Sequence, residues 1–336
     1  MKNILYIGNQ LSQNNKTATT IDTLSALLQG EGYNVTKTSN KKNKVLRLLD
    51  MLFHIIKRKK NTDVVLIDTY STTNFYYAYL CGIMCFYLKL KYIPILHGGN
   101  LPSRLKTSPK LSNRLFNNAH INVAPSLYLM SEFKTAGFNN ITHIPNVIEL
   151  KQYQFKKRDI DTIRMLWVRS FSSIYNPELA VSILKSFKTN NIPASLCMVG
   201  PDNDGSLLTT KAYAKKIDVE VEFTGKLSKK EWHKKAEDFN VFINTTTIDN
   251  MPVSVIEAMA LGLPVVSNNV GGLPYLIEHN IDGILVASNT KEAFKSAILK
   301  LKNDELFLSE ITTNARRKVK DFDWSIVKHQ WFSVLS

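Results

Sequence analysis

Eleven short runs rich in β-branched and aromatic residues recur along the chain, with helical patterns between them. The runs lie at residues 4–8, 64–68, 92–99, 121–126, 141–146, 164–170, 195–200, 219–225, 241–246, 263–268 and 283–286. Strands that alternate with helices predict parallel sheets covered on both faces. Because these runs are too many for one compact sheet and show no eightfold regularity, we expect two doubly wound α/β domains that face each other.

A boundary between the two domains is indicated by residues 150–164, a polar and charged segment that precedes a fresh series of strands. We therefore expect an N-terminal Rossmann-like domain over residues 1–158 and a C-terminal Rossmann-like domain that begins at residue 159. In such sheets ligands bind outside the carboxyl ends of the strands. Glycine, asparagine and serine follow most of the predicted strands, which favours a ligand cleft between the domains but is also typical of short loops.

The three cysteines indicate a reducing compartment. Cys81 and Cys85 lie one helical turn apart in an apolar segment, residues 75–88, and Cys197 stands alone. Three cysteines cannot all pair, and their spacing is not that of a metal site, so we expect buried free thiols. The apolar segment is too short to span a membrane, and the apolar run at the start of the chain is too short for the core of a signal peptide. We expect a cytoplasmic, soluble protein.

Positive charge is concentrated in the first half of the chain. Residues 1–160 carry 22 Lys plus Arg against 8 Asp plus Glu, whereas residues 161–336 carry 21 against 20. This asymmetry indicates an anionic partner that meets only the first half. Residues 41–60 combine basic ends with apolar positions at helical spacing. Two interpretations of that segment stay open: a helix that faces the core with a solvated edge, or a basic amphipathic helix that docks on anionic lipid.

A lone carboxylate stands in an otherwise apolar stretch. Between Asp249 and Glu278 the only charged side chain is Glu257, which falls within a predicted helix from Pro252 to Leu261. A helix that is apolar nearly all round is buried, and an unpaired buried carboxylate costs several kcal/mol. Two partners would satisfy Glu257: a vicinal diol such as a ribose, or a Lys or Arg distant in the sequence. The helix N-terminus near residue 250 is also suited to phosphate or sugar hydroxyls.

The stretch "DNMPVSVIEAMALGLPVVSNNVGGLPYLIEHNIDGILV", from residue 249, resembles the signature of family 4 glycosyltransferases of the GT-B fold. Weaker matches follow the same order over nearly the whole chain: "HGGN", "IPNVI", "VRS", "MVGPD", "FTGKLSKKEW" and "FDWSIVKHQW". The resemblance implies an active site in the cleft between the two domains. It also implies that the C-terminal domain ends near residue 318 and that a helix over residues 319–336 returns to the N-terminal domain.

The resemblance further implies roles for matching residues. Glu257 would hold the ribose hydroxyls of a sugar nucleotide, Arg169 would neutralise the leaving diphosphate, and Asp249 would lie near the donor sugar. His97 would lie near the donor sugar and the acceptor. The other donor-binding positions are Gly8, Gly225, Lys226, Asn250, Met251, Pro252 and Val253. The acceptor-binding positions are Thr17, Gly98, Asn100 and Asn146.

Simpler interpretations of the catalytic candidates stay open. His97 would cap a strand end, Arg169 would form a surface ion pair, and Asp249 would cap a helix N-terminus. The chain also departs from the family pattern. The first acidic position is the shorter Asp249 rather than Glu, the first loop lacks the usual glycine pair, and no Lys follows Arg169 at the usual spacing.

We therefore expect a retaining, metal-independent glycosyltransferase that uses a nucleotide sugar, with a UDP-sugar favoured over a GDP-sugar. The acceptor would be a saccharide or an anionic, lipid-linked saccharide in cell-surface polysaccharide biosynthesis, at the inner face of a membrane with which the basic N-terminal domain associates. The alternatives are a catalytically degenerate GT-B protein or a sugar-nucleotide epimerase. A basic nucleic-acid-binding protein is disfavoured, because no nucleic-acid motif is present.

Overall fold

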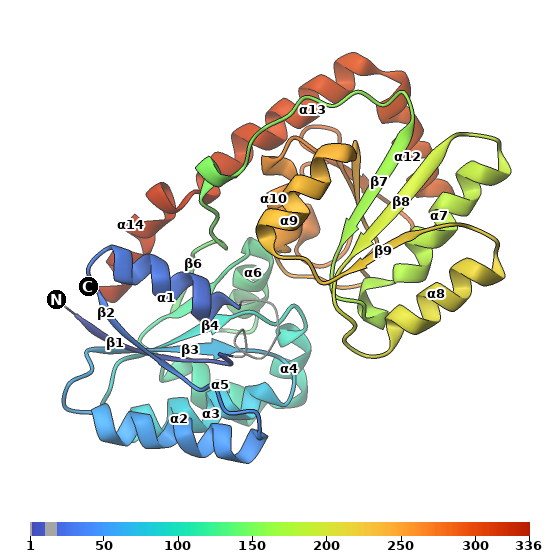
Figure 1. Cartoon of the computed structure of the whole chain (residues 1–336). Helices are drawn as coiled ribbons and strands as arrows, with labels where there is room; N and C mark the ends of the chain where they lie inside the picture. Colours follow the sequence, from blue (N-terminus) through green and yellow to red (C-terminus); the bar gives the residue numbers. More distant parts are fainter. Residues whose placement is uncertain (1, 11–18) are drawn as a thin grey trace. The chain divides into compact units, whose positions relative to one another are not determined.

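The computed structural model describes residues 2–10 and 19–336 of the chain. Its contacts divide the chain into two compact units, which we name unit 1 and unit 2 (Figure 1). Unit 1 comprises residues 1–145 and 328–336, and unit 2 comprises residues 146–327. Each unit is built on its own six-stranded parallel sheet. Two doubly wound α/β domains are thus confirmed.

Unit 1 has the strand order β2-β1-β3-β4-β5-β6. Because β2 lies on one side of β1 and β3 on the other, the topological switch point is between β1 and β3, where ligands bind in such sheets. The strands are β1 (Asn3–Ile7), β2 (Asn34–Thr38), β3 (Val64–Thr69), β4 (Tyr92–Leu96), β5 (Asn122–Ala124) and β6 (Ile141–His143). The helices are α1 (Thr20–Gly30), α2 (Lys44–Arg58), α3 (Asn74–Tyr87), α4 (Leu101–Thr107), α5 (Pro109–Asn117) and α6 (Leu127–Thr135).

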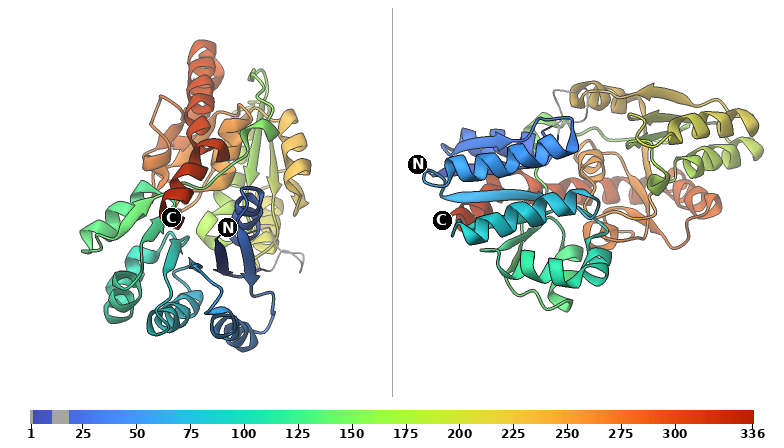
Figure 2. Two further views of the ribbon diagram at one scale, coloured as in Figure 1. Left: turned by 90° about the vertical axis from the view of Figure 1, so that its left-hand side faces the viewer. Right: turned by 90° about the horizontal axis from the view of Figure 1, so that it is seen from below.

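Helices cover both faces of the unit 1 sheet. Helix α1 lies on one face, and α2, α3 and α5 lie on the other (Figure 1). The second face holds a continuous apolar core in which Ile7 and Ile67 of the strands meet Ile55 of α2 and Phe75 of α3. The views in Figure 2 show α2 and α3 running side by side on that face.

Unit 2 has the strand order β12-β11-β10-β7-β8-β9, which is the order of a Rossmann fold with its switch point between β7 and β10. The strands are β7 (Ile163–Val168), β8 (Ala194–Val199), β9 (Glu222–Gly225), β10 (Val241–Asn244), β11 (Val265–Asn268) and β12 (Ile284–Val286). The helices are α7 (Pro177–Thr189), α8 (Ser206–Lys216), α9 (Lys229–Lys235), α10 (Val253–Ala260), α11 (Leu273–Leu276), α12 (Lys291–Asn303), α13 (Glu305–Lys318) and α14 (Trp324–Leu335), whose residues from Lys328 count with unit 1.

Alternation along the strands of unit 2 builds a core on each face of the sheet. Trp167 packs with α7 and α12, whereas its neighbour Leu166 packs with α10 on the opposite face. Because these parallel strands are buried on both faces, their sequences are continuous apolar runs and do not alternate between apolar and polar residues. Helix α10 is buried along most of its length, which confirms the predicted helix to within one residue at each end.

The segment 146–158, which we assigned by sequence to the N-terminal domain, packs within unit 2. Ile148 N donates to Phe322 O at 3.0 Å, and the buried guanidinium of Arg158 donates to the carbonyls of Ala236 and Phe239. The compact units accordingly divide after residue 145 and after residue 327. The three cysteines are buried and free, as predicted. No helix within residues 2–10 and 19–336 is long and apolar enough to cross a membrane.

Candidate active site

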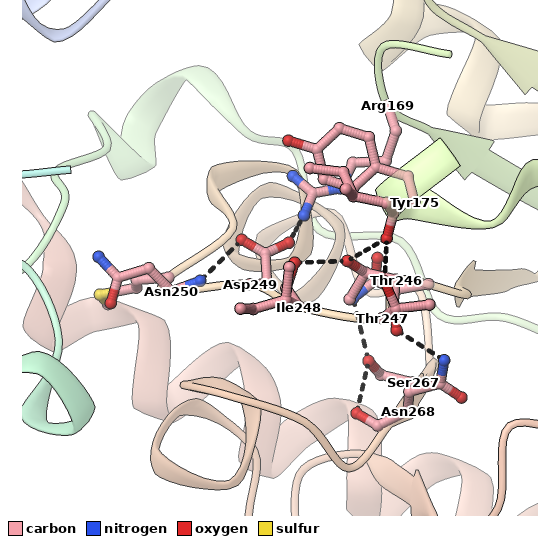
Figure 3. Close-up of polar contacts among 12 residues, drawn as sticks. Arg169, Tyr175, Thr246, Thr247, Ile248, Asp249, Asn250, Ser267 and Asn268 are labelled. Atoms are coloured by element: carbon pink, nitrogen blue, oxygen red, sulfur yellow. Dashed lines mark hydrogen bonds and ion pairs between the residues drawn. The ribbon is translucent and has the colours of Figure 1, made fainter. Parts of the chain in front are cut away.

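The switch point of unit 2 brings two predicted catalytic residues together. Arg169 directly follows β7, and Asp249 lies in the loop that follows β10. Their side chains form an ion pair through an Arg169 terminal nitrogen and Asp249 Oδ2 (Figure 3). Because β7 and β10 are the strands between which the chain direction reverses, the pair lies where a doubly wound sheet binds its ligand.

Arg169 is enclosed by its surroundings. Its side chain is 13% exposed, and its guanidinium carbon lies 4.4 Å from the centre of the Tyr175 ring. Burial lowers the pKa of Arg169 below its usual value, and its Nε has no hydrogen-bond partner among the described residues. Arg169 thus forms an ion pair, as one of the two interpretations predicted, but its side chain is largely buried instead of lying at the surface. Tyr175 lies in the segment where the family pattern has a Lys, so an aromatic face rather than a second cation accompanies Arg169.

The loop between β10 and α10 is held by hydrogen bonds to its backbone carbonyls. Asn268 Nδ2 donates to Thr246 O at 2.7 Å, and Gly272 N donates to Asp249 O at 3.0 Å. A Cβ on Gly272 would lie 1.8 Å from Asn250 O, so only glycine permits this approach of the two loops. Asp249 Oδ1 accepts from Asn250 N at 2.9 Å, but the residue that caps α10 is Pro252. The helix-cap interpretation of Asp249 is thus wrong.

Glu257 lies on α10, and its side chain is 5% exposed. Tyr153 OH donates to Glu257 Oε1 at 2.8 Å, and Lys229 Nζ lies 2.8 Å from the same oxygen. Of the two partners considered for this carboxylate, the structure contains the cation distant in the sequence. The Lys229 side chain is about half exposed, at 51%, so water screens the ion pair. Burial, followed by the charge of Glu257, raises the pKa of Tyr153 well above its usual value.

His233 of α9 completes this cluster. Its ring centre lies 4.6 Å from that of Tyr153, and its Nε2 is buried without a hydrogen-bond partner among the described residues. Burial lowers the pKa of His233 from its ordinary value of 6.5, which the charge of Glu257 offsets in part. A neutral imidazole with an unused ring nitrogen can accept or donate one hydrogen bond to a bound ligand.

Unit 1 holds a second buried carboxylate at its own switch point. His97 Nε2 lies 2.8 Å from Asp68 Oδ1, and Tyr6 OH donates to the same oxygen at 2.9 Å. The Asp68 side chain is 1% exposed. Because an ionised carboxylate only accepts, Nε2 carries the hydrogen, which fixes the orientation of the His97 ring. His97 is thus held by a side chain as well as by its place after β4.

Gly8 contacts the other oxygen of Asp68. A Cβ at Gly8 would lie 2.4 Å from Asp68 Oδ2, so a side chain at this position would force the buried carboxylate to move. Asp68 Oδ2 is buried and has no hydrogen-bond partner among the described residues. The structure thus brings Gly8 and His97, two separately predicted residues, to the same buried carboxylate in unit 1.

The remaining predicted site residues lie on loops and helix starts. Gly225 ends β9 with a φ of 71° and its carbonyl accepts from Gly200 N at 2.9 Å; the exposed Lys226 follows it. Met251 O accepts from Asn146 Nδ2 at 2.9 Å, and Val253 begins α10. In unit 1 Gly98 lies against the Ser71 backbone, and Asn100 directly precedes α4. Thr17 lies outside the described residues.

Sequence reasoning missed the residues that hold the predicted ones in place. They are Tyr6, Asp68, Tyr153, Tyr175, Lys229 and His233. Asp68 carried a usable signal, because a single carboxylate ends the apolar run "VVLID", much as Glu257 interrupts an apolar helix. Tyr153 and Lys229 carried none, since each is distant in sequence from the carboxylate that it contacts.

Comparison with known proteins decides the family. The family profile described as "Glycosyl transferases group 1" matches residues 151–318, half of the chain. The chain belongs to this glycosyltransferase family. The matched region contains Arg169, Asp249 and Glu257, so the switch-point pair and the buried carboxylate of α10 are parts of a glycosyltransferase domain.

Individual glycosyltransferases are similar over longer stretches. The amylovoran biosynthesis glycosyltransferase AmsK of Erwinia amylovora is 25% identical over 263 residues, which are 74% of this chain and 64% of AmsK. A UDP-Gal:alpha-D-GlcNAc-diphosphoundecaprenol alpha-1,3-galactosyltransferase of Escherichia coli is 26% identical over 207 residues, 56% of this chain and 51% of that enzyme. The chain thus spans less than two thirds of the length of these curated relatives.

The fold has a similar solved structure. Anabaena HepE, determined in complex with UDP and glucose, superposes with a TM-score of 0.80 at 17% identity, over 99% of this chain and 98% of HepE. Together with the two helix-covered parallel sheets, this likeness gives our glycosyltransferase the two-domain, Rossmann-like GT-B fold.

Proposed function

We propose that this glycosyltransferase is a family 4 enzyme that moves a sugar from a nucleotide sugar to a saccharide or a lipid-linked saccharide, with retention of anomeric configuration. A UDP-sugar is favoured over a GDP-sugar. The place of the reaction is cell-surface polysaccharide assembly, since AmsK is named for amylovoran biosynthesis and the Escherichia coli relative for a diphosphoundecaprenol acceptor. The solved neighbour HepE, bound to UDP and glucose, supports the choice of donor.

The observation that carries the proposal is the enclosed Arg169 at the switch point, beside the loop that opens α10. In the reaction the bond between the anomeric carbon and the diphosphate oxygen breaks, and the acceptor hydroxyl oxygen bonds to that carbon. The hydroxyl proton leaves with the diphosphate. Arg169 and the backbone N–H groups of Asn250, Met251 and Val253 stabilise the negative charge on the departing diphosphate. Before this step, when the donor binds, its diphosphate replaces Asp249 as the partner of Arg169, which frees Asp249 to contact the donor sugar.

Glu257 receives the ribose in this proposal. Its present partner Lys229 is about half exposed and is free to swing into water when two ribose hydroxyls arrive. Tyr153 keeps its hydrogen bond and holds the carboxylate in place. Gly225 and Lys226 lie beside the base, in the segment that leads from the end of β9 to Lys229 at the start of α9.

We assign the other predicted positions to the remaining parts of the reaction. His97 serves the donor sugar and acceptor, held by Asp68, and Gly8 lets the first loop approach the diphosphate. Thr17, Gly98, Asn100 and Asn146 bind the acceptor. No metal is required, and the basic residues of unit 1 associate with the anionic, inner face of a membrane.

The test is thermal stabilisation of the chain by UDP-, GDP-, ADP- and CMP-sugars, with Glu257→Ala beside the wild type. A ligand that binds only the native state increases the free energy of unfolding, by about 2.7 kcal/mol when it is present at a hundredfold excess over Kd. The melting temperature rises as a result. We expect a shift with a UDP-sugar that is lost in Glu257→Ala. No shift with any nucleotide sugar, in a folded sample, would contradict the proposed donor.

A second assay separates transfer from the alternatives. Free nucleotide should appear only when a lipid-linked saccharide is supplied, and adding a chelator should leave the rate unchanged. Conversion of the nucleotide sugar to an epimer, with no release of free nucleotide, would indicate an epimerase. Binding without turnover for any acceptor would indicate a degenerate member of the family.

A further inference from the structure

The outward face of α2 is apolar. Val45, Leu49, Phe53 and Ile56 follow one another at spacings of four, four and three residues, so they share one face of the helix. Their exposed fractions are 66%, 55%, 56% and 51%. Met51 and Ile55, on the opposite side, make the core contacts of this helix. Helix α2 thus faces the core with one side, against which Leu48 and Leu52 also pack. The exposed stripe of Val45, Leu49, Phe53 and Ile56 lies outside that core and needs another partner.

The apolar surface continues into α3. An apolar groove between the two helices is lined by Leu52, Ile56, Leu80, Ile83, Met84, Tyr87 and Leu88. Figure 2 shows the two helices side by side. Monomeric soluble proteins rarely expose a contiguous apolar surface of this kind, and such surfaces mark sites of interaction.

Basic side chains stand at both ends of the same helix. They are Lys41, Lys42 and Lys44 at the start, and Lys57, Arg58, Lys59 and Lys60 at the end. All seven are exposed, and none forms an ion pair with a residue that the structure describes. The only acidic residue of α2, Asp50, lies 3.7 Å from the ring of His54. The apolar face is thus bounded by positive charges that have no ion-pair partner among the described residues, and Lys57 Nζ lies 5.6 Å from the centre of the Phe53 ring.

This combination selects one occupant. A second copy of the chain packed on this face would bring like charges together, and a neutral apolar partner would leave the seven cations without counter-charges. An anionic lipid leaflet satisfies both features, because hydrocarbon receives the apolar side chains while lipid phosphates receive the Lys and Arg side chains.

We propose that α2 lies in the plane of an anionic membrane, with its outer face in the acyl boundary and the α2–α3 groove filled by lipid hydrocarbon. The inference deepens the proposed membrane association by naming its surface. Its test uses lipid binding alone, so that failure of the glycosyltransferase assignment and failure of the membrane surface are distinguishable.

The apolar part is tested by co-sedimentation of the full chain with phosphatidylglycerol vesicles and with phosphatidylcholine vesicles. We expect wild-type protein to bind the anionic vesicles and to bind the neutral ones far more weakly. The double variant Leu49→Gln, Phe53→Gln should bind the anionic vesicles at least about tenfold more weakly, because burial of two large apolar side chains is lost. The matched control is Leu208→Gln, Leu306→Gln, at two leucines of unit 2 that are even more exposed, which should bind as wild type does.

The charged part is tested in the same way. Lys57→Gln, Lys59→Gln, Lys60→Gln should weaken binding on the order of 100-fold, since each cation near an anionic surface contributes about a factor of five. The control changes three exposed lysines of unit 2: Lys188, Lys215 and Lys216. Equal loss in the test and control variants would overturn the assignment to α2.

Insertion is tested by Phe53→Trp. The four native tryptophans are buried, so this substitution adds an exposed one. Phosphatidylglycerol with brominated acyl chains should quench its fluorescence and should not quench that of Leu208→Trp. Absence of quenching in bound protein would contradict insertion. If the lipid-free protein is a dimer and the double variant Leu49→Gln, Phe53→Gln is a monomer, the face belongs to a second copy of the chain. That result would overturn the membrane proposal.

Discussion

Glu257 is a buried carboxylate whose two contacts differ in exposure. Tyr153 is buried, whereas Lys229 is half in water, so the hydrogen bond contributes more to stability than the ion pair. The lone charge in an apolar helix was readable from the sequence, and so was the need for a partner. The identity of that partner could not be predicted, because Tyr153 and Lys229 are far from Glu257 in the sequence and only the fold brings them to it. Asp68 went unnoticed because a carboxylate at the end of a strand also fits an ordinary loop.

Tyr153→Phe should destabilise the protein by about 1–2 kcal/mol, because Oε1 of the buried Glu257 loses its buried donor. Urea unfolding of the full chain measures the change. Tyr213→Phe is the matched control, since the Tyr213 hydroxyl pairs with the neutral hydroxyl of Ser182 at 2.9 Å. We expect a smaller loss there. Equal losses in the two variants would show that the charge of Glu257 adds nothing to the Tyr153 bond.

His233 should make stability depend on pH. Its folded pKa lies below the unfolded value near 6.5, so the unfolded chain binds more protons as the pH falls through that value. Acidification from pH 7 to pH 5 should therefore destabilise the wild type more than His233→Gln, which has no proton to gain at this position. Urea unfolding of both proteins at several pH values gives the difference. A difference that is independent of pH would mean that His233 titrates normally in the fold.

At the scale of elements, the apolar strands were predicted and the polar one was missed. Each of the eleven predicted runs overlaps a strand, β1 and β3 to β12, because strands of a parallel sheet are apolar on both faces. β2, "NVTKT", lies at the edge of its sheet, where polar residues suffice and leave no apolar signal. The same limit applied to α2, since helical spacing alone does not say which side of an apolar stripe meets the core.

Gly272→Ala tests how the loops after β10 and β11 hold the start of α10. A Cβ at Gly272 meets backbone atoms of Asn250 and not a flexible side chain, so the loop must move. We expect a loss of more than about 2 kcal/mol in urea unfolding, with a weaker thermal shift by the nucleotide sugar. Gly30→Ala, at the end of α1 with nothing within 4 Å of the added Cβ, is the control. It should stay within about 1 kcal/mol of the wild type.

At the scale of the whole molecule, our proposals assign a different ligand to each unit. The first 160 residues carry 22 basic against 8 acidic side chains and include the apolar and basic surface of α2. Unit 2 is nearly balanced in charge and carries Arg169, the start of α10 and Glu257. The charge asymmetry was visible in the sequence. The role of α2 could be inferred only from the exposed fractions of its apolar side chains, because a core helix with basic residues at its ends would have the same composition.

Hydrogen exchange of the full chain should therefore show two separate footprints. A UDP-sugar should protect the loops after β7 and β10 and the first turn of α10, because their N–H groups become occupied, and should leave α2 unchanged. Phosphatidylglycerol vesicles should protect α2 and leave α10 unchanged. The variants Glu257→Ala and Leu49→Gln, Phe53→Gln should each remove one footprint and keep the other. Protection of α2 by the nucleotide sugar alone, or of α10 by vesicles alone, would contradict this division, because it would mean that one ligand orders the surface assigned to the other.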